Sequence, residues 1–156
     1  MPLDRFYVPI EGHVNKEAAF LCGFQWLLGR PEPDLRIAFN SKDNLEDVFK
    51  AMLAKYGSDK TLTQMFTALL KHRYVQIQNG PKITAVLLNP RLPSHANGAC
   101  LGVWVDTKQL AKIETALGPV GAVCAAPWGK LDIDAWVQTN SPAPLECDGG
   151  GETQTT

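Results

Sequence analysis

The sequence predicts a three-layer α/β domain, Rossmann-like or flavodoxin-like, with a mostly parallel sheet and helices on both faces. Segments of strand length alternate along the chain with segments of helical spacing, as in layered α/β folds. The runs 101–105 and 120–125 are almost continuously apolar, which is typical of strands covered on both faces. The 156 residues, 45% of them hydrophobic, suffice for one domain with its own core.

Apolar side chains that recur every three or four residues predict helices. These helices are 44–56, 62–72, 106–117 and a short one near 133–137. Asn44 is the expected N-cap of the first, Thr61 and Gln64 have the spacing of a capping box at the second, and Asp106 opens the third. The segment 15–28 is apolar around almost its whole axis, which predicts a helix that is buried on most sides or meets a partner.

Short apolar runs between the helices predict the remaining strands, which are 6–10, 35–39, 74–78 and 82–88. Pro9 cannot donate a backbone hydrogen bond, so we expect the first strand at an edge of the sheet. Asn79-Gly80 indicates a hairpin that would make one pair of strands antiparallel. The segment 141–156 is acidic and rich in Pro and Gly, so we expect a flexible tail behind a single domain, 1–140.

Composition argues against several classes of protein. A formal net charge of −1 is too small for a nucleic-acid binder, and no run of about 18 apolar residues predicts a membrane span. The four cysteines form no C-x-x-C pair, and the N-terminus has no signal-peptide pattern. We therefore expect a cytoplasmic protein with reduced thiols and no cofactor or metal.

Polar side chains and one aromatic ring follow the expected parallel strands, where ligands bind in open sheets of this class. These candidate ligand-binding residues are Asn40, Ser41, Lys42, Asp106, Thr107, Lys108 and Trp128. The two lysines and the helix starts suit a small anionic ligand, and the indole suits stacking. The same residue types also cap helices or close the end of a core, and this interpretation stays open.

The sequence thus favours a small-ligand or nucleotide-type binding domain to which no catalysis is assigned. Neither G-x-G-x-x-G nor G-x-x-x-x-G-K-[ST] occurs in it. The alternative is a non-catalytic interaction module or accessory subunit that meets a protein partner, or itself, through helix 15–28. An enzymatic site around Glu11, His13 and Asp106 has the least support, and the long segment 89–99 with His95 is either mobile or functional.

Overall fold

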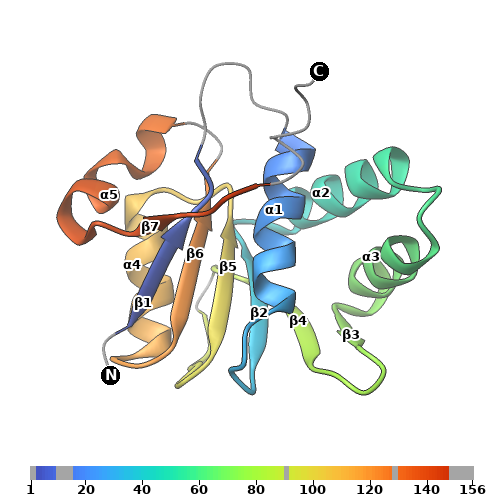
Figure 1. The fold of residues 1–156 in the computed structure, drawn as a ribbon, viewed down its shortest axis with the longest axis horizontal. Helices are drawn as coiled ribbons and strands as arrows, with labels where there is room; N and C mark the ends of the chain where they lie inside the picture. Colours follow the sequence, from blue (N-terminus) through green and yellow to red (C-terminus); the bar gives the residue numbers. More distant parts are fainter. Residues whose placement is uncertain (1–2, 10–15, 90–91, 128–129, 148–156) are drawn as a thin grey trace.

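The computed structural model describes residues 3–9, 16–89, 92–127 and 130–147 and confirms the α/β prediction. Seven strands form one sheet in the order β3-β4-β2-β5-β6-β1-β7 (Figure 1). The strands are β1 (Asp4–Tyr7), β2 (Leu35–Phe39), β3 (Tyr74–Gln76), β4 (Lys82–Leu87), β5 (Ala99–Val103), β6 (Ala122–Ala126) and β7 (Ala143–Pro144). The helices are α1 (Lys16–Leu28), α2 (Lys42–Lys55), α3 (Lys60–His72), α4 (Thr107–Leu117) and α5 (Asp134–Asn140), the last preceded by a 3₁₀ turn, Lys130–Ile133.

The strand pairing follows the expectation from the apolar runs. β2, β5 and β6 lie side by side and parallel, with Ile37 opposite Leu101 and Leu101 opposite Cys124. The hairpin predicted by Asn79-Gly80 is present, because β3 and β4 pair antiparallel while the other neighbours are parallel. The sheet is therefore the three-layer, mostly parallel kind found in Rossmann-like and flavodoxin-like domains.

The two faces of the sheet are covered by different helices. α1, α2 and α3 pack on the front face, and α4 with α5 packs on the back face, so that α1 lies in front of the strands and α4 behind them in Figure 1. α1 comes close to β5, since a Cβ on Gly23 would lie 2.6 Å from the Leu101 side chain. Glycine at this position lets the helix approach the centre of the sheet.

Two helix caps differ from the sequence-based expectation. Ser41, not Asn44, is the N-cap of α2, because the Ser41 hydroxyl accepts a hydrogen bond from the Asn44 backbone N–H at 3.1 Å. Asp59, rather than Thr61, caps α3 through the Leu62 N–H at 3.0 Å. Each helix begins with polar residues, three in α2 and two in α3, so the apolar pattern begins after the helix has already started.

The expected edge position of the first strand is wrong. β1 ends at Tyr7, before Pro9, and pairs with β6 on one side and with β7 on the other. The Val8 N–H continues the ladder by donating to Ala125 O at 2.9 Å. Pro9 thus lies beyond the strand, where its missing N–H does not interrupt the sheet.

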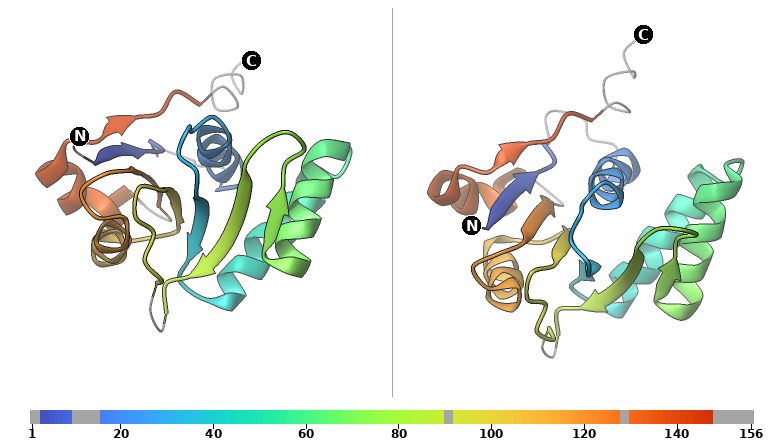
Figure 2. Two further views of the ribbon diagram at one scale, coloured as in Figure 1. Left: turned by 90° about the horizontal axis from the view of Figure 1, so that it is seen from below. Right: turned by 60° about the horizontal axis from the view of Figure 1, so that its bottom comes forward.

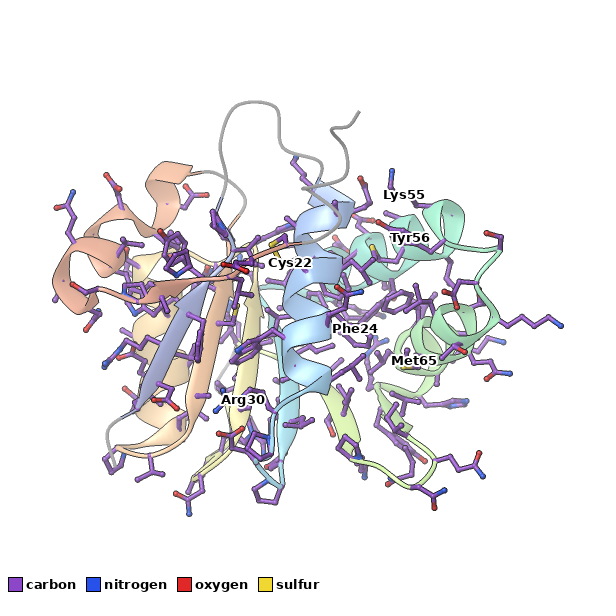
Figure 3. The ribbon with its side chains drawn as sticks, in the orientation of Figure 1. Cys22, Phe24, Arg30, Lys55, Tyr56 and Met65 are labelled. Carbon is purple, nitrogen blue, oxygen red and sulfur yellow. A yellow bond between two sulfur atoms is a disulfide. The ribbon has the colours of Figure 1, made fainter. Side chains whose placement is uncertain are left out.

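The expectations of four reduced thiols and of a flexible tail from residue 141 also need correction. Cys22 on α1 forms a disulfide with Cys147, and β7 lies along β1, so residues 143–147 belong to the folded domain (Figures 2 and 3). Cys100 and Cys124 are free and buried, as expected. Burial raises the pKa of the Cys100 thiol to about 12, which keeps that thiol neutral.

The apolar helix 15–28 is observed as α1 and is mostly covered. Phe24 and Leu27 are fully buried, and within α1, whose residues are all described, only Gln25 is exposed. Trp26 is half-buried, 5.5 Å from the Phe6 ring and 5.5 Å from the Arg30 guanidinium carbon. No helix among the described residues is long and apolar enough to cross a membrane.

Candidate functional site

The chain changes its side of the sheet between two neighbouring strands, β2 and β5. After β2 it enters α2 on the front face, and after β5 it enters α4 on the back face. The chain therefore leaves the carboxyl ends of these two paired strands towards opposite faces of the sheet. In doubly wound α/β folds this topological switch point is where ligands bind.

A shallow hollow lies between α1 and α2 and reaches the switch point at Trp104; its empty space is about 200 Å³ with the adjoining open solvent included. We call it the switch-point hollow. Its lining comes from the first turns of α1, from α2 and from the residue after β5: Lys16, Glu17, Phe20, Val48, Ala51, Met52 and Trp104. Most lining residues are apolar, and the two charged side chains belong to α1. Small-molecule sites commonly combine an apolar lining with a few polar groups that orient the ligand.

Trp104 has an unusual backbone conformation. Its φ is +56°, in the left-handed region that bulky residues seldom adopt, and its N–H donates to Ala126 O. The left-handed turn breaks the alternation of the strand: Val103 and Trp104 both pack on the front face, and Val105 packs on the back. The conformation thus directs the indole towards α1 and α2 instead of into the back layer.

The rim of the hollow carries opposite charges. Lys16 and Glu17 begin α1, and Tyr56 ends α2 nearby. Burial, followed by the negative charge of Glu17, raises the pKa of the Tyr56 hydroxyl. Tyr56 therefore stays protonated at neutral pH, so its hydroxyl remains able to donate a hydrogen bond near the α1 end of the hollow.

Four of the sequence-predicted ligand residues have local roles at helix starts. Ser41 caps α2, and Asp106 caps α4 in a capping box with Gln109, with both hydrogen bonds at 2.9 Å. Lys42 is exposed and lies 4.0 Å from the Glu46 carboxylate, and Lys108 is exposed on α4. None of these four side chains lines the switch-point hollow.

The other predicted residues are placed separately. The Asn89 side-chain amide donates to the backbone O and to Oδ1 of Asn40, each at 3.2 Å, and Lys112 Nζ donates to Asn89 Oδ1 at 3.4 Å. The Thr107 hydroxyl donates to Asp132 O at 3.3 Å. Asn40 is thus joined to the end of β4 and to α4, and Thr107 to the turn before α5. Trp128 lies outside the described residues.

Of the candidates outside the strand ends, His95 is the one that lies among the described residues. Glu11 and His13 lie outside the described residues. His95 is buried, and its ring Nε2 donates to the Asp34 backbone O at 2.8 Å. The backbone N–H of His95 donates to Ala116 O at 2.9 Å. His95 therefore anchors its loop to the domain. Burial lowers the pKa of His95. The described residues contain no group of three or more potential metal ligands.

The sequence-based prediction chose the carboxyl edge of the sheet and named none of the residues that line the hollow. It placed Trp104 inside the strand 101–105, whereas β5 ends at Val103. Had the sequence marked the end of the strand at Val103, Trp104 would have been a candidate ligand-binding residue. The apolar run continues through Val105, however, so the sequence does not show where the strand ends. Lys16 and Glu17 carry no signal of their own, because charged residues are common in the first turn of a helix.

Comparison with models of protein families, with curated proteins and with solved structures finds no match. The functional inference therefore starts from the geometry of the switch-point hollow. That geometry combines an apolar floor, a half-buried indole and two charged side chains at a topological switch.

Proposed function

We propose that this chain is a small-ligand or nucleotide-type binding domain and that its ligand occupies the switch-point hollow. One observation carries the proposal: the hollow is lined by Trp104, which follows β5 at the topological switch and adopts a left-handed backbone conformation. Strained backbone conformations cluster at functional sites, and Trp104, unlike Arg73 at the C-cap of α3, has no helix end to account for its positive φ. We assign no catalytic step.

The lining suggests the chemical class of the ligand. The Trp104 indole and the Phe20 and Met52 side chains offer an apolar surface suited to a planar ring or a small aliphatic group. Lys16 attracts an anionic substituent, and the positive end of the α1 dipole has the same polarity. A small molecule with one flat apolar part and one negative group fits this arrangement best.

The alternative, an interaction module that meets its partner through helix 15–28, has less support. Most of α1 is covered by the sheet, by the neighbouring helices and by the C-terminal segment, and Phe24 is fully buried. A partner that binds this helix could contact only Gln25 and the exposed atoms of the half-buried side chains. The switch-point hollow offers a more defined surface.

The cytoplasmic location expected from the sequence remains a prediction, and the Cys22–Cys147 disulfide argues against it. Stable disulfides are typical of oxidising compartments, whereas those of the cytosol are mostly catalytic or redox-sensing. Cell fractionation with thiol trapping would distinguish the two settings.

The ligand proposal is tested by NMR of the indole N–H groups. We would titrate the protein with AMP, ADP, a sugar phosphate and a small aromatic carboxylate. Binding in the hollow shifts the Trp104 indole resonance and leaves that of Trp136, which donates to Glu114 on the back face, unchanged. Because Trp104→Ala removes this reporter, binding to the variants is followed at the backbone amide of Ala51, which also lines the hollow. This amide should no longer respond to ligand in Trp104→Ala, whereas it should still respond in Lys108→Ala, an exposed site outside the hollow.

Two results would contradict the proposal. If none of the four probes moves the Trp104 resonance, the hollow does not bind this class of ligand. If Lys42→Ala and Lys108→Ala abolish binding but Trp104→Ala does not, the ligand occupies the helix starts instead. That second result would restore the site expected from the sequence.

A further inference from the structure

The C-terminal segment 141–147, which we call the strap, is attached to the domain in an unusual way. It leaves α5, runs along β1 as β7, and reaches α1, where Cys147 bonds to Cys22, 125 residues away in sequence (Figures 1 and 2). Leu145 and Cys147 pack against the front core. The strap thus joins the far edge of the sheet to a central helix.

The noncovalent contacts of the strap are few apart from those of the buried Pro142 and the half-buried Leu145 and Cys147. β7 has two residues, both exposed, and Pro144 has no N–H to donate to the sheet. The Leu145 N–H donates to Tyr7 O at 2.9 Å. Ordering a backbone segment costs conformational entropy at every residue. A strand of two residues forms few hydrogen bonds that could offset this cost. The disulfide is therefore the strongest restraint on the strap.

We propose that the Cys22–Cys147 disulfide is a redox latch: it holds the strap on β1 when oxidised and releases the strap when reduced, while the rest of the domain stays folded. The released strap leaves β1 as an open edge of the sheet. The proposal does not depend on ligand binding in the switch-point hollow.

The two sulfur atoms differ in access, which sets the direction of the reaction. Cys22 is buried at 8% exposure, whereas Cys147 is half-buried. A dithiol reductant, whether a small molecule or a protein dithiol, attacks Cys147 Sγ as a thiolate and forms a mixed disulfide, so Cys22 leaves as a thiolate and takes up a proton. The second thiol of the reductant then displaces Cys147, which is also protonated. Two electrons and two protons reach the chain, and the dithiol becomes a disulfide.

The remaining fold does not depend on the latch. α1 is held by the fully buried Phe24 and Leu27 and by the close approach of Gly23 to Leu101. β1 keeps its parallel ladder with β6 over residues 4–7. Reduction therefore frees only the edge of β1 that pairs with β7, and the central strands stay paired.

The test compares amide hydrogen exchange in the oxidised protein with that in the protein reduced by dithiothreitol. We expect exchange at Leu145 to become at least about tenfold faster on reduction, while exchange at Leu101 in β5 stays unchanged. The Cys22→Ser/Cys147→Ser variant should exchange like the reduced protein with or without reductant. Should this variant fail to fold, the reduced wild-type chain supplies the same comparison.

Alkylation provides an independent measurement. Iodoacetamide should label Cys147 in the native reduced protein and leave the buried Cys100 and Cys124 unlabelled. Unchanged protection of Leu145 after reduction would overturn the latch, because contacts alone would then hold the strap. Loss of protection at Leu101 would also overturn it, since the disulfide would then support the whole domain.

Discussion

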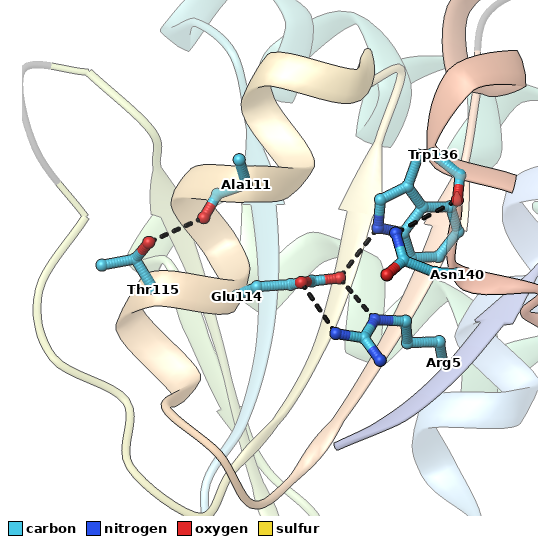
Figure 4. A network of polar contacts seen from close by, with 6 residues as sticks. All are labelled: Arg5, Ala111, Glu114, Thr115, Trp136 and Asn140. Atoms are coloured by element: carbon cyan, nitrogen blue, oxygen red, sulfur yellow. Dashed lines mark hydrogen bonds and ion pairs between the residues drawn. The ribbon is translucent and has the colours of Figure 1, made fainter. Parts of the chain in front are cut away.

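Both faces of the sheet have an apolar core, but the back face adds a polar network to it. On the front face, Phe20, Phe24, Phe39, Phe49 and Phe66 form a cluster whose ring centroids lie 5.1–6.0 Å apart. On the back face, a polar network crosses the margin of the core: Arg5 of β1 donates two hydrogen bonds to Glu114 of α4, and Trp136 of α5 donates a third (Figure 4).

Because of this difference, the contributions of the two faces to the free energy of unfolding respond differently to pH and salt. The front layer is held by apolar contacts, which scarcely respond to pH or salt. The back layer joins three elements through one carboxylate, Glu114, with Nε–Oε2 and Nε1–Oε2 distances of 2.8 Å to Arg5 and Trp136. Its contribution depends on the charge of that carboxylate and on the geometry of its donors.

The largest expected effect comes from emptying the front cluster. Phe24 is fully buried, with its ring centroid 5.1 Å from that of Phe66, and points from α1 into the cluster (Figure 3). Phe24→Ala should lower the free energy of unfolding by about 3–5 kcal/mol, because the cavity adds to the lost transfer free energy. Urea denaturation measures the change.

The matched control is an aromatic side chain outside the front cluster. Tyr74 is 47% exposed and contacts Lys82 Nζ at 4.5 Å from the ring centroid. Tyr74→Ala should cost only about 0.5 kcal/mol. Equal losses for Phe24 and Tyr74 would mean that the front cluster is not the principal source of stability.

The next effect is expected on the back face. Glu114→Ala leaves the Arg5 charge and the Trp136 indole N–H without their acceptor, in a region where the Arg5 and Glu114 side chains are 28% and 20% exposed. We expect a loss of about 2 kcal/mol, with a smaller loss for Glu114→Gln, whose amide oxygen still accepts one hydrogen bond. Glu46→Gln, which removes the exposed pair with Lys42, should change stability by less than about 0.5 kcal/mol.

The stability contributed by Glu114 should decrease as the pH falls. Burial alone would raise the pKa of Glu114, but the hydrogen bonds from Arg5 and Trp136 and the charge of Arg5 together lower it below its ordinary value of 4.5. The folded protein therefore binds the proton less readily than the unfolded chain does. The stability advantage of wild type over Glu114→Gln should be complete above about pH 4.5 and should vanish as the pH falls through the lowered pKa. An advantage that does not change with pH would contradict a charged role for Glu114.

The order and type of the elements were predictable, because each depends on a local pattern. Apolar spacing marks the buried stripe of α2 at Leu45, Val48, Phe49 and Met52, and Asn79-Gly80 marks the hairpin. The starts of α2 and α3 were not predictable in this way, since α2 begins with three polar residues and α3 with two before the first apolar residue of the pattern.

The contacts that define the candidate site and the latch depend on distance in space. Cys22 and Cys147 have a Cα–Cα distance of 5.3 Å although 125 residues separate them, and no spacing rule connects them. The hollow likewise needs α1, α2 and the end of β5 to be placed together. The sequence located the carboxyl edge of the sheet, but polar strand-end residues such as Ser41 and Asp106 serve there as caps.

The smallest expected effect tests the backbone strain beneath the indole of Trp104. Trp104→Gly and Trp104→Ala both remove the ring, so their difference reports the backbone alone. Since φ is +56°, the Gly variant should be more stable than the Ala variant by about 0.5–1 kcal/mol. At Val103, an ordinary position in β5, the order should reverse, because glycine loses more conformational entropy on folding. If alanine were the more stable substitution at both positions, the left-handed turn would impose no strain, and the indole orientation would follow from packing alone.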